Sequence, residues 1–331
     1  MNNPEQRQSG RREFLARTAK AGLAVAAVGA ASYLLYDPAV PTPAEDAGRL
    51  VTLPDFSVPA VPAKAMSIVT GAERTRTVDK AIELLGGIER FVKPGETVAI
   101  KPNVAFASPP ALGATTNPDL VGEVVRLCYK AGARKVIIAD NPINDAASCF
   151  ALSGVDAAAR RTGAQVLLPT DSMFKYTTLE GGKLIRNWQV FFEPFIKADK
   201  LIGIAPVKDH QRAGASMTIK NWYGLLGGRR NIFHQDINTI IAELSMMVRP
   251  TLVILDGTEV MVTNGPTGGS VSDLKRANTM IASCDQVAAD AYGCTLLGLK
   301  PSDLPYLAKA QQAGSGKIDY ESLKPKLTAI S

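Results

Sequence analysis

Two histidines and two lysines in one stretch of this sequence are its clearest candidates for chemistry. His210 and His234 are the only histidines of the 331 residues, and both lie within positions 204–236 together with Lys208 and Lys220. Imidazole exchanges protons near neutral pH and binds metals, while an ammonium group attracts anions. We therefore take Lys208, His210, Lys220 and His234 as candidate catalytic residues, and His210 and His234 as candidate metal ligands.

These residues also have structural interpretations. A histidine is often a hydrogen-bonded core residue, and Lys220 is compatible with a solvated helical position. The separation between His210 and His234 is not diagnostic of a metal site. Trp222 and Tyr223 follow Lys220 closely, and this aromatic pair is expected to wall a pocket.

Polar side chains also follow the apolar runs that predict buried strands. Lys101 and Asn103 come after the run at 98–100, and Asp140 follows 136–139. In the same way Lys208 and His210 follow 201–205, and Asp256 follows 252–255. Because ligands of open α/β sheets bind beyond the carboxyl ends of the strands, we expect these residues to meet at one rim. The candidate ligand- or cofactor-binding residues are Lys101, Asn103, Asp140, Asn221, Asp256, Asn264 and Gly265.

Asn264 and Gly265 open a glycine-rich turn at 264–269. Glycine permits close backbone approach, so the N–H groups of such a turn are able to hold an anion, although a plain flexible turn has the same pattern. The turn is neither a Walker loop nor GxGxxG, and the chain has no GxSxG, HExxH or EF-hand motif.

The elements that must position these residues alternate along the chain. Apolar runs predict strands at 65–70, 97–101, 135–140, 165–168, 199–205, 251–256 and 278–283. Amphipathic or capped stretches predict helices at 78–91, 117–131, 146–161, 216–226, 236–248, 285–297 and 304–313. This alternation predicts an α/β fold over residues 65–331, with a mostly parallel sheet flanked by helices on both faces. Residues 171–194 break the alternation and predict a β-ribbon insertion.

The N-terminus predicts targeting rather than structure. Residues 9–15, SGRREFL, resemble the twin-arginine export signal, and an uncharged run follows from Ala21 to Tyr36. We therefore expect residues 1–36 to direct the chain to the twin-arginine export machinery. The protein is then periplasmic, or anchored to the membrane by an uncleaved signal; a basic amphipathic N-terminus of a cytosolic protein is the alternative. Prolines recur through 37–64, which predicts an extended linker with folded structure beginning near Ala65.

Composition excludes some classes of function. The formal net charge is +6, and five basic residues in the first 36 account for much of it, so a basic surface for nucleic acid is not predicted. The four cysteines, at 128, 149, 284 and 294, form no CxxC pair. The sequence therefore has no pattern for an iron–sulfur cluster or a structural zinc site, and it identifies no cofactor. A disulfide is compatible with export, but its pairing is not assigned.

Several motifs together resemble one family, the domain-of-unknown-function family 362 of bacteria and archaea. They are VAIKPN at 98–103, ATTNPDLV at 114–121, GARKVIIADNP at 132–142, LIGIAPVKDH at 201–210, TIKNWYGLLGG at 218–228, FHQDI at 233–237, PTLVILDGTEVMVTNGPTGG at 250–269 and ASCDQVAADAYGCTLLG at 282–298. The resemblance implies that the candidates above recur in the family, and it adds Asp285 to the ligand-binding set. Relatives often carry ferredoxin-type cysteines or twin-arginine signals, which implies a redox setting, but this chain lacks the ferredoxin cysteines.

These observations favour an exported α/β enzyme or cofactor-binding protein for a small anionic ligand. The lysines would hold a carboxylate or phosphate, Asn103 and Asn221 would orient it, and a histidine would act as general acid–base or metal ligand. Asp140 or Asp256 would orient that histidine. Two alternatives remain: a non-enzymatic ligand-binding or assembly protein that works with a redox partner protein, and a metal-dependent redox protein with histidine and aspartate ligands.

Overall fold

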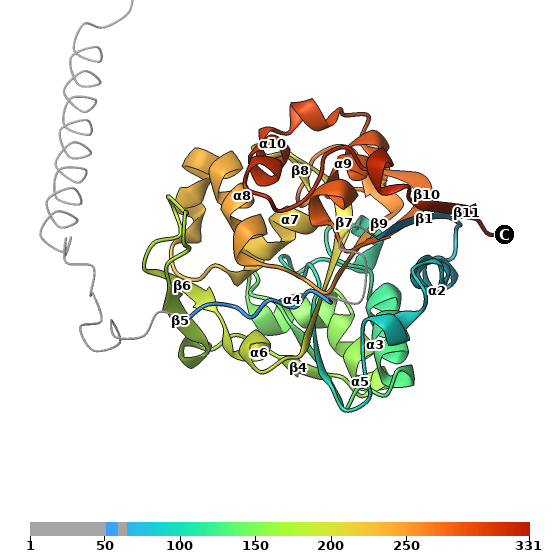
Figure 1. Ribbon diagram of the computed structural model, residues 1–331, viewed down its shortest axis with the longest axis horizontal. Coiled ribbons are helices and arrows are strands. Elements are labelled where there is room, and N and C mark those ends of the chain that lie inside the picture. The colour runs from blue at the N-terminus through green and yellow to red at the C-terminus, as the bar shows by residue number, and fades with distance from the viewer. Residues whose placement is uncertain (1–50, 59–64) are drawn as a thin grey trace, which may run out of the picture. The chain divides into compact units, whose positions relative to one another are not determined.

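A computed structural model describes residues 51–58 and 65–331 of the chain (Figure 1). The predicted targeting segment, 1–36, lies outside the described residues, as do residues 37–50 and 59–64 of the predicted linker. In the part of the chain that the structure describes, no helix has the length and apolar character needed to cross a membrane.

The centre of the described domain is a nine-stranded sheet. Its order is β11-β1-β10-β9-β7-β2-β3-β4, and β8 pairs with β7. Strands β9, β7, β2, β3 and β4 run parallel to one another, while β10 is antiparallel to both β9 and β1. The predicted α/β class with a mostly parallel sheet is confirmed. The strands are β1 (Met66–Thr70), β2 (Thr97–Lys101), β3 (Lys135–Ala139), β4 (Gln165–Leu167), β7 (Lys200–His210), β8 (Gly214–Ser216), β9 (Leu252–Met261), β10 (Leu274–Ser283) and β11 (Lys326–Ala329).

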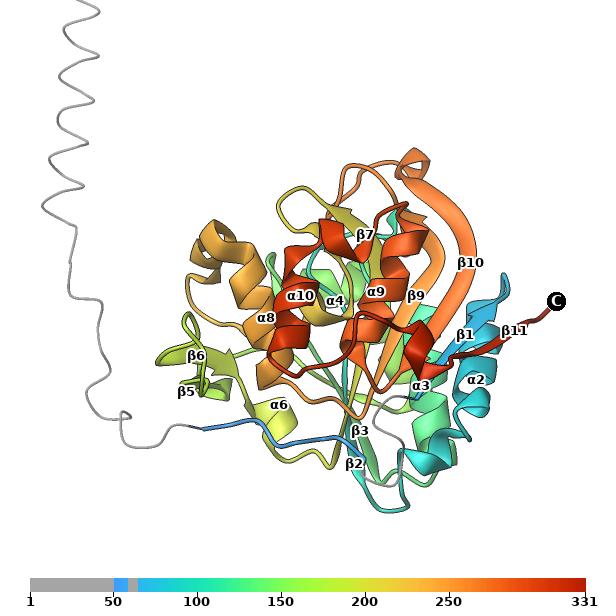
Figure 2. The same cartoon turned by 45° about the horizontal axis from the view of Figure 1, so that its top comes forward.

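Helices cover both faces of this sheet (Figures 1 and 2). One face carries α2 (Arg74–Leu84), α3 (Pro118–Lys130), α4 (Ala146–Leu152) and α5 (Val155–Thr162). The other carries α7 (Thr218–Asn221), α8 (Ile237–Met247), α9 (Gln286–Leu296) and α10 (Pro305–Gln312). Alternation within β2 divides its side chains between the two cores, since Val98 and Ile100 face α3 while Ala99 faces the opposite layer.

Local sequence explains where the helices begin and end. Asn117 caps α3 by accepting a hydrogen bond from the N–H of Asp119, and Pro118 occupies the first turn, as predicted. The predicted helix at 146–161 is instead two helices, because Gly154 adopts φ 75° between α4 and α5. That left-handed conformation favours glycine and ends the first helix.

Two strands run further than their apolar runs predict. β7 continues past Ala205 to His210, and β9 continues past Asp256 to Met261. The added residues of β7 form backbone hydrogen bonds with β8, and those of β9 form them with β10. The polar residues in these extensions are therefore part of the sheet. Hydrogen-bond pairing, rather than hydrophobicity, therefore sets these strand ends.

The predicted β-ribbon is present as a separate two-stranded sheet. β5 (Phe174–Thr177) and β6 (Trp188–Phe191) pair antiparallel. The carboxylate of Glu243 on α8 accepts hydrogen bonds from the backbone N–H groups of residues 183–185, which connect the two strands. The ribbon is thus fastened to α8 through a buried carboxylate.

Residues 51–58 pack against the domain although the sequence places them in the linker. Phe56 is 2% exposed, and its N–H donates to the carbonyl of Arg249. The hydroxyl of Thr251 in turn donates to the carbonyl of Phe56 at 2.7 Å. Proline excludes helix here but leaves an extended chain free to bury an aromatic side chain, so folded structure precedes Ala65.

Candidate functional site

A pocket of about 180 Å³ lies beyond the carboxyl ends of β2 and β3 and against the extended end of β7. We call it the inner pocket. Nine of the residues singled out in the sequence line it: Lys101, Asn103, Asp140, Lys208, His210, Lys220, Asn221, Tyr223 and His234. The structure therefore brings together side chains from β2, β3, β7, α7 and the 3₁₀ segment η5 (Arg230–Asp236).

A buried ion pair forms the floor of the inner pocket. The Nζ of Lys101 lies 2.6 Å from an oxygen of Asp140 and donates to the side-chain oxygen of Asn221 at 3.0 Å. Asp140 also accepts the N–H of Val104, and Asn221 donates to the carbonyl of Ile204. Burial lowers the pKa of Lys101, and the Asp140 carboxylate opposes that shift. This pair neutralises itself, so it leaves little charge for a ligand.

Among the residues that the structure describes, Lys208 has no carboxylate partner. Its Nζ donates to the carbonyls of Ala114 at 2.6 Å and Pro266 at 3.3 Å. Burial, and then the charge of Lys220, lower the pKa of Lys208 to about 7. Carbonyl oxygens solvate the ammonium but do not cancel its charge.

Lys220 is still less compensated. Its Nζ lies 5.2 Å from the centre of the Tyr223 ring, and among the described residues it has no hydrogen-bond or ion-pair partner. Burial, followed by the charge of Arg230, lowers the pKa of Lys220 to about 8. A bound anion would favour the charged form of both lysines.

Arg230 adds a third cation that pairs with no carboxylate in the described part of the chain. Its guanidinium donates to the carbonyls of Asn141 and Pro142 at 2.9 and 2.8 Å, and to those of Tyr223 and Leu226 at 3.4 and 3.1 Å. Burial lowers the pKa of Arg230, with Asp140 opposing. The sequence indicates only a Gly-Gly-Arg-Arg turn here, and nothing in it distinguishes Arg230 from the exposed Arg229.

Hydrogen bonds fix the tautomer of His210. Its Nδ1 accepts the backbone N–H groups of Arg212 and Ala213, both at 3.2 Å, so the proton of the neutral ring is on Nε2. Burial, together with the charge of Lys220, lowers the pKa of His210 to about 3. His210 is therefore a neutral donor at physiological pH.

His234 has the opposite tautomer. Its Nδ1 lies 3.2 Å from the carbonyl of Asn231, which only accepts, so Nδ1 carries the proton. The hydroxyl of Tyr223 lies 3.1 Å from the same nitrogen and gives its own proton to the carbonyl of Arg230. Burial, and then the charge of Lys220, lower the pKa of His234, which leaves Nε2 with a free lone pair. The two rings are stacked with centroids 6.1 Å apart.

No metal centre is evident in the described part of the chain. Among residues 51–58 and 65–331, no three histidine, cysteine, aspartate or glutamate side chains are grouped so that they would hold a metal ion. The cysteines described there are free thiols, and Cys128, Cys149 and Cys294 are buried.

Two predicted carboxylates lie outside the inner pocket. Asp256 is within β9 rather than at its end, and it pairs with Arg74 of α2 at 2.9 Å. Asp285 caps α9 by accepting the N–H groups of Val287 and Ala288. Asp285 follows β10, which runs antiparallel to its neighbours. It therefore lies at the end of the sheet opposite to the carboxyl ends of the parallel strands.

Neither Asn264 nor Gly265 of the glycine-rich turn lines the inner pocket, but the turn places Pro266 in the pocket wall. Asn264, at φ 55°, donates to Asp273 at 2.6 Å and does not line the inner pocket. Gly265 lies so close to β7 that a Cβ there would collide with the carbonyl of Asp209. This approach brings Pro266, whose carbonyl contacts Lys208, to the pocket wall.

Two further residues, Asp290 and Gly224, position the side chains of the site. Asp290 of α9 is buried and accepts the N–H groups of Thr218 and Ile219 at the start of α7, which carries Lys220. A Cβ at Gly224 would collide with the Asp140 carboxylate and with Lys101, so glycine permits the ion pair to form. Asp290 was missed because its helical context gives no sign of a buried carboxylate.

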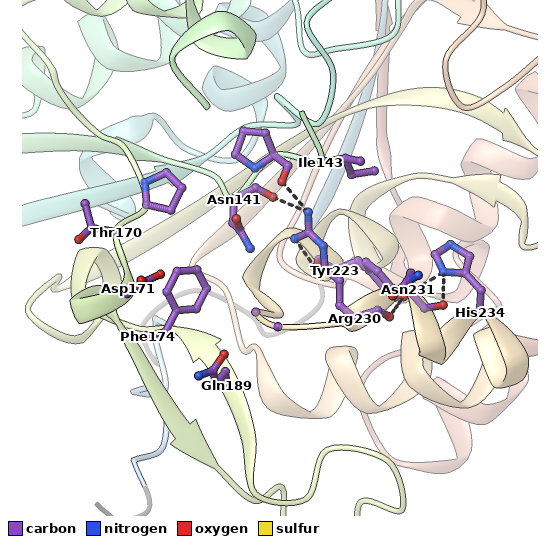
Figure 3. A pocket seen from close by; sticks show the side chains of 14 residues that line it. Asn141, Ile143, Thr170, Asp171, Phe174, Gln189, Tyr223, Arg230, Asn231 and His234 are labelled. Atoms are coloured by element: carbon purple, nitrogen blue, oxygen red, sulfur yellow. Dashed lines mark hydrogen bonds between the residues drawn. The ribbon is translucent and has the colours of Figure 1, made fainter. Parts of the chain in front are cut away.

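A larger groove of about 630 Å³ continues from the inner pocket (Figure 3). We call it the outer groove. Its far wall comes from the segment before β5 and from the ribbon, where Phe174 and Gln189 face it. The inner pocket and the outer groove share five lining residues: Asn141, Ile143, Tyr223, Arg230 and His234.

Comparison with known proteins gives the family. Residues 98–295 match the family described as Domain of unknown function (DUF362), and the chain belongs to this family. A thylakoid-associated protein of Synechocystis sp. is 27% identical over 246 residues, which cover 70% of this chain and 73% of that protein.

Two solved structures are also similar. The lactate racemase apoprotein from Thermoanaerobacterium thermosaccharolyticum has a TM-score of 0.38 and 17% identity, covering 74% of this chain and 58% of that one. A protein from Thermotoga maritima has a TM-score of 0.36 and 10% identity, with 73% and 59% covered. This chain thus spans less than two thirds of each of these structures.

Proposed function

We propose that the inner pocket binds a small anion, a carboxylate or a phosphate-like group, and that the protein uses proton transfer on it. The observation that carries the proposal is the buried Lys208 and the half-buried Lys220, which line the pocket without a carboxylate partner among the described residues. Uncompensated buried cations are costly, so a binding site for an anion is the simplest reason to keep them.

The polar groups around these lysines suit an anion. The tautomer of His210 makes its Nε2–H a donor, and the side-chain amide of Asn103 lies between Lys208 and Asn221. Among the described residues that line the inner pocket, Asp140 is the only carboxylate, and it is already paired with Lys101. An anion would therefore meet donors from several sides and little repulsion.

His234 is the proposed proton acceptor. Its Nε2 has a lone pair while Nδ1 is held by Asn231, so the ring is oriented by the backbone rather than by Asp140 or Asp256. Burial raises the pKa of Tyr223 to about 12, so its hydroxyl stays protonated beside the imidazole. A ligand with an acidic proton near its anionic group would be the substrate of this arrangement.

Calorimetric titration with sulfate, inorganic phosphate and acetate tests the binding step. At least one of these anions should bind the full chain, and Lys220→Met should weaken that binding by about tenfold or more, since the ion pair between the half-buried ammonium and the anion is lost. Lys309→Met removes an exposed charge on α10 and serves as the matched control. If none of the three anions binds, or if both variants bind as the native chain does, the proposal fails.

We further propose that the chain is exported by the twin-arginine machinery. Arg11 and Arg12 within SGRREFL and the uncharged run after them support this location. Replacing both arginines by lysine should leave the protein in the cytoplasm, as measured by cell fractionation. Export that survives the double replacement would contradict this route.

A further inference from the structure

We propose that the ligand has two parts: an anionic head in the inner pocket and a flat, uncharged body in the outer groove against Phe174. This inference rests on the proposed function, since it assumes that the head is an anion. It adds the chemical class of the rest of the molecule.

Size is the first reason for a second part. The inner pocket, at about 180 Å³, is small and suits a charged group with few further atoms. Sites for small molecules are typically about 300–1,000 Å³. The 630 Å³ of the outer groove bring the combined site into that range.

Continuity is the second reason. The inner pocket and the outer groove share Tyr223, Arg230 and His234 among their lining residues. Figure 3 shows Arg230 reaching from η5 towards Asn141, while Phe174 and Gln189 stand across the groove. The rest of a ligand whose anionic head contacts Lys208 and Lys220 would therefore extend into the outer groove.

The chemistry of the outer groove selects the body. Phe174 is half-buried and stacks on Phe191 with ring centroids 5.3 Å apart, so a fixed aromatic ring faces the groove. Gln189 and Asn141 add amide groups, and Asp171 is the only carboxylate among the groove's lining residues. An aromatic ring and amides favour a planar group that stacks and forms hydrogen bonds, whereas Asp171 disfavours a second negative charge.

The groove is also held in shape without a ligand. The N–H of Gly227 donates to the carbonyl of Gln189 at 2.8 Å, and the indole of Trp188 donates to the carbonyl of Gly227 at 3.2 Å. On the other side Asn141 donates to the carbonyl of Leu226 at 2.9 Å. Because both walls are fixed to the same loop, little ordering is needed when the body binds.

A series of phosphates with one head and different bodies tests this inference. Inorganic phosphate, phenyl phosphate and 2-naphthyl phosphate are each titrated into the native protein and into its variants, all as the full chain. We expect 2-naphthyl phosphate to bind about tenfold or more tightly than inorganic phosphate, a difference of about 1.4 kcal/mol or more, because its ring system stacks on Phe174. Phe174→Ala should abolish that gain and leave the affinity for inorganic phosphate unchanged.

Two variants and one control separate the outcomes. Phe174→Leu keeps an apolar side chain but not the flat ring, so it should lose most of the gain in affinity. It replaces Phe174→Ala in the test if that variant does not fold. Tyr292→Ala alters an aromatic pair with Tyr320 that lines neither pocket, and it should keep the full gain. Equal affinities for the three phosphates in the native protein, or a gain that survives both Phe174 variants, would overturn the inference alone. Failure of all three to bind would overturn the inference, and failure of sulfate and acetate to bind as well would overturn the proposed function with it.

Discussion

At the scale of single residues, the charge of the inner pocket depends on pH in the physiological range. Lys208 and Lys220 have pKa values lowered to about 7 and about 8, mainly by burial. At pH values between these pKa values and the ordinary pKa of lysine, both ammonium groups are largely deprotonated in the free protein. An anion would require them to be protonated. Proton uptake then accompanies binding, and affinity rises as pH falls.

We predict that sulfate affinity falls steeply as pH rises. Sulfate keeps its charge, so the change reports the protein alone. Affinity should be highest near pH 6 and should fall by up to about tenfold for each lysine and each pH unit above its pKa. Isothermal titration in buffers of different ionisation enthalpy measures both the affinity and the protons taken up. Equal affinity at about pH 6 and about pH 9 would rule out the two lysines as the charged groups.

The two imidazoles offer a direct spectroscopic prediction. The full chain has only two histidines, so ¹⁵N labelling of histidine gives two rings. We expect one ring protonated on Nε2 (His210) and the other on Nδ1 (His234), because their backbone partners are opposite in kind. Between about pH 5 and pH 8 the ring of His210 should not titrate, since its pKa is lowered to about 3. Two rings with the same tautomer would contradict this geometry; His234→Gln assigns the signals.

At the scale of elements, the close approach of one short helix to two strand ends decides whether the ion pair forms. The 3₁₀ segment η4 (Trp222–Leu225) presents Gly224 to Lys101 and Asp140. We predict that Gly224→Ala weakens anion binding and leaves the helical content unchanged, because a methyl group there overlaps both the Asp140 carboxylate and the Lys101 ammonium and so disrupts the floor of the inner pocket. Circular dichroism and titration with sulfate measure the two effects. Gly269→Ala is the control, since a Cβ there meets no atom within 4 Å. Weaker binding in both variants, or in neither, would contradict the prediction.

The elements also show how far sequence reasoning reaches. Apolar runs located the buried parallel strands, and Asn117-Pro118 located the start of α3, because burial and capping are local properties. Strand ends were less predictable: Asp256 follows an apolar run, yet β9 continues because β10 pairs with it. The position of Asp285 depends on the direction of the strand before it. The position of the Arg230 guanidinium depends on its hydrogen bond to Pro142, 88 residues away in the sequence. Such long-range pairing is absent from any local pattern.

At the scale of the whole molecule, residues 51–58 belong to the folded domain. We predict that Phe56→Ala lowers the free energy of unfolding by about 3–5 kcal/mol, the usual cost of emptying a buried aromatic site. Urea denaturation of the full chain measures it. Ser57→Ala, at an exposed neighbour, should change the free energy by less than about 0.5 kcal/mol. A change for Phe56→Ala as small as that for Ser57→Ala would mean that the segment contributes nothing to stability.

The origin of the pocket walls along the chain has a consequence for biosynthesis. The inner pocket takes its lining from Lys101 through Thr267, and its strands are not neighbours in sequence. A growing chain that has reached Asp140, just after β3, has both partners of the ion pair but neither Lys208 nor Lys220, so a chain of that length lacks the proposed anion site. A ligand bound as we propose would therefore enter only after most of the chain has been made and folded. The compartment in which folding finishes would then be the earliest compartment from which such a ligand is drawn.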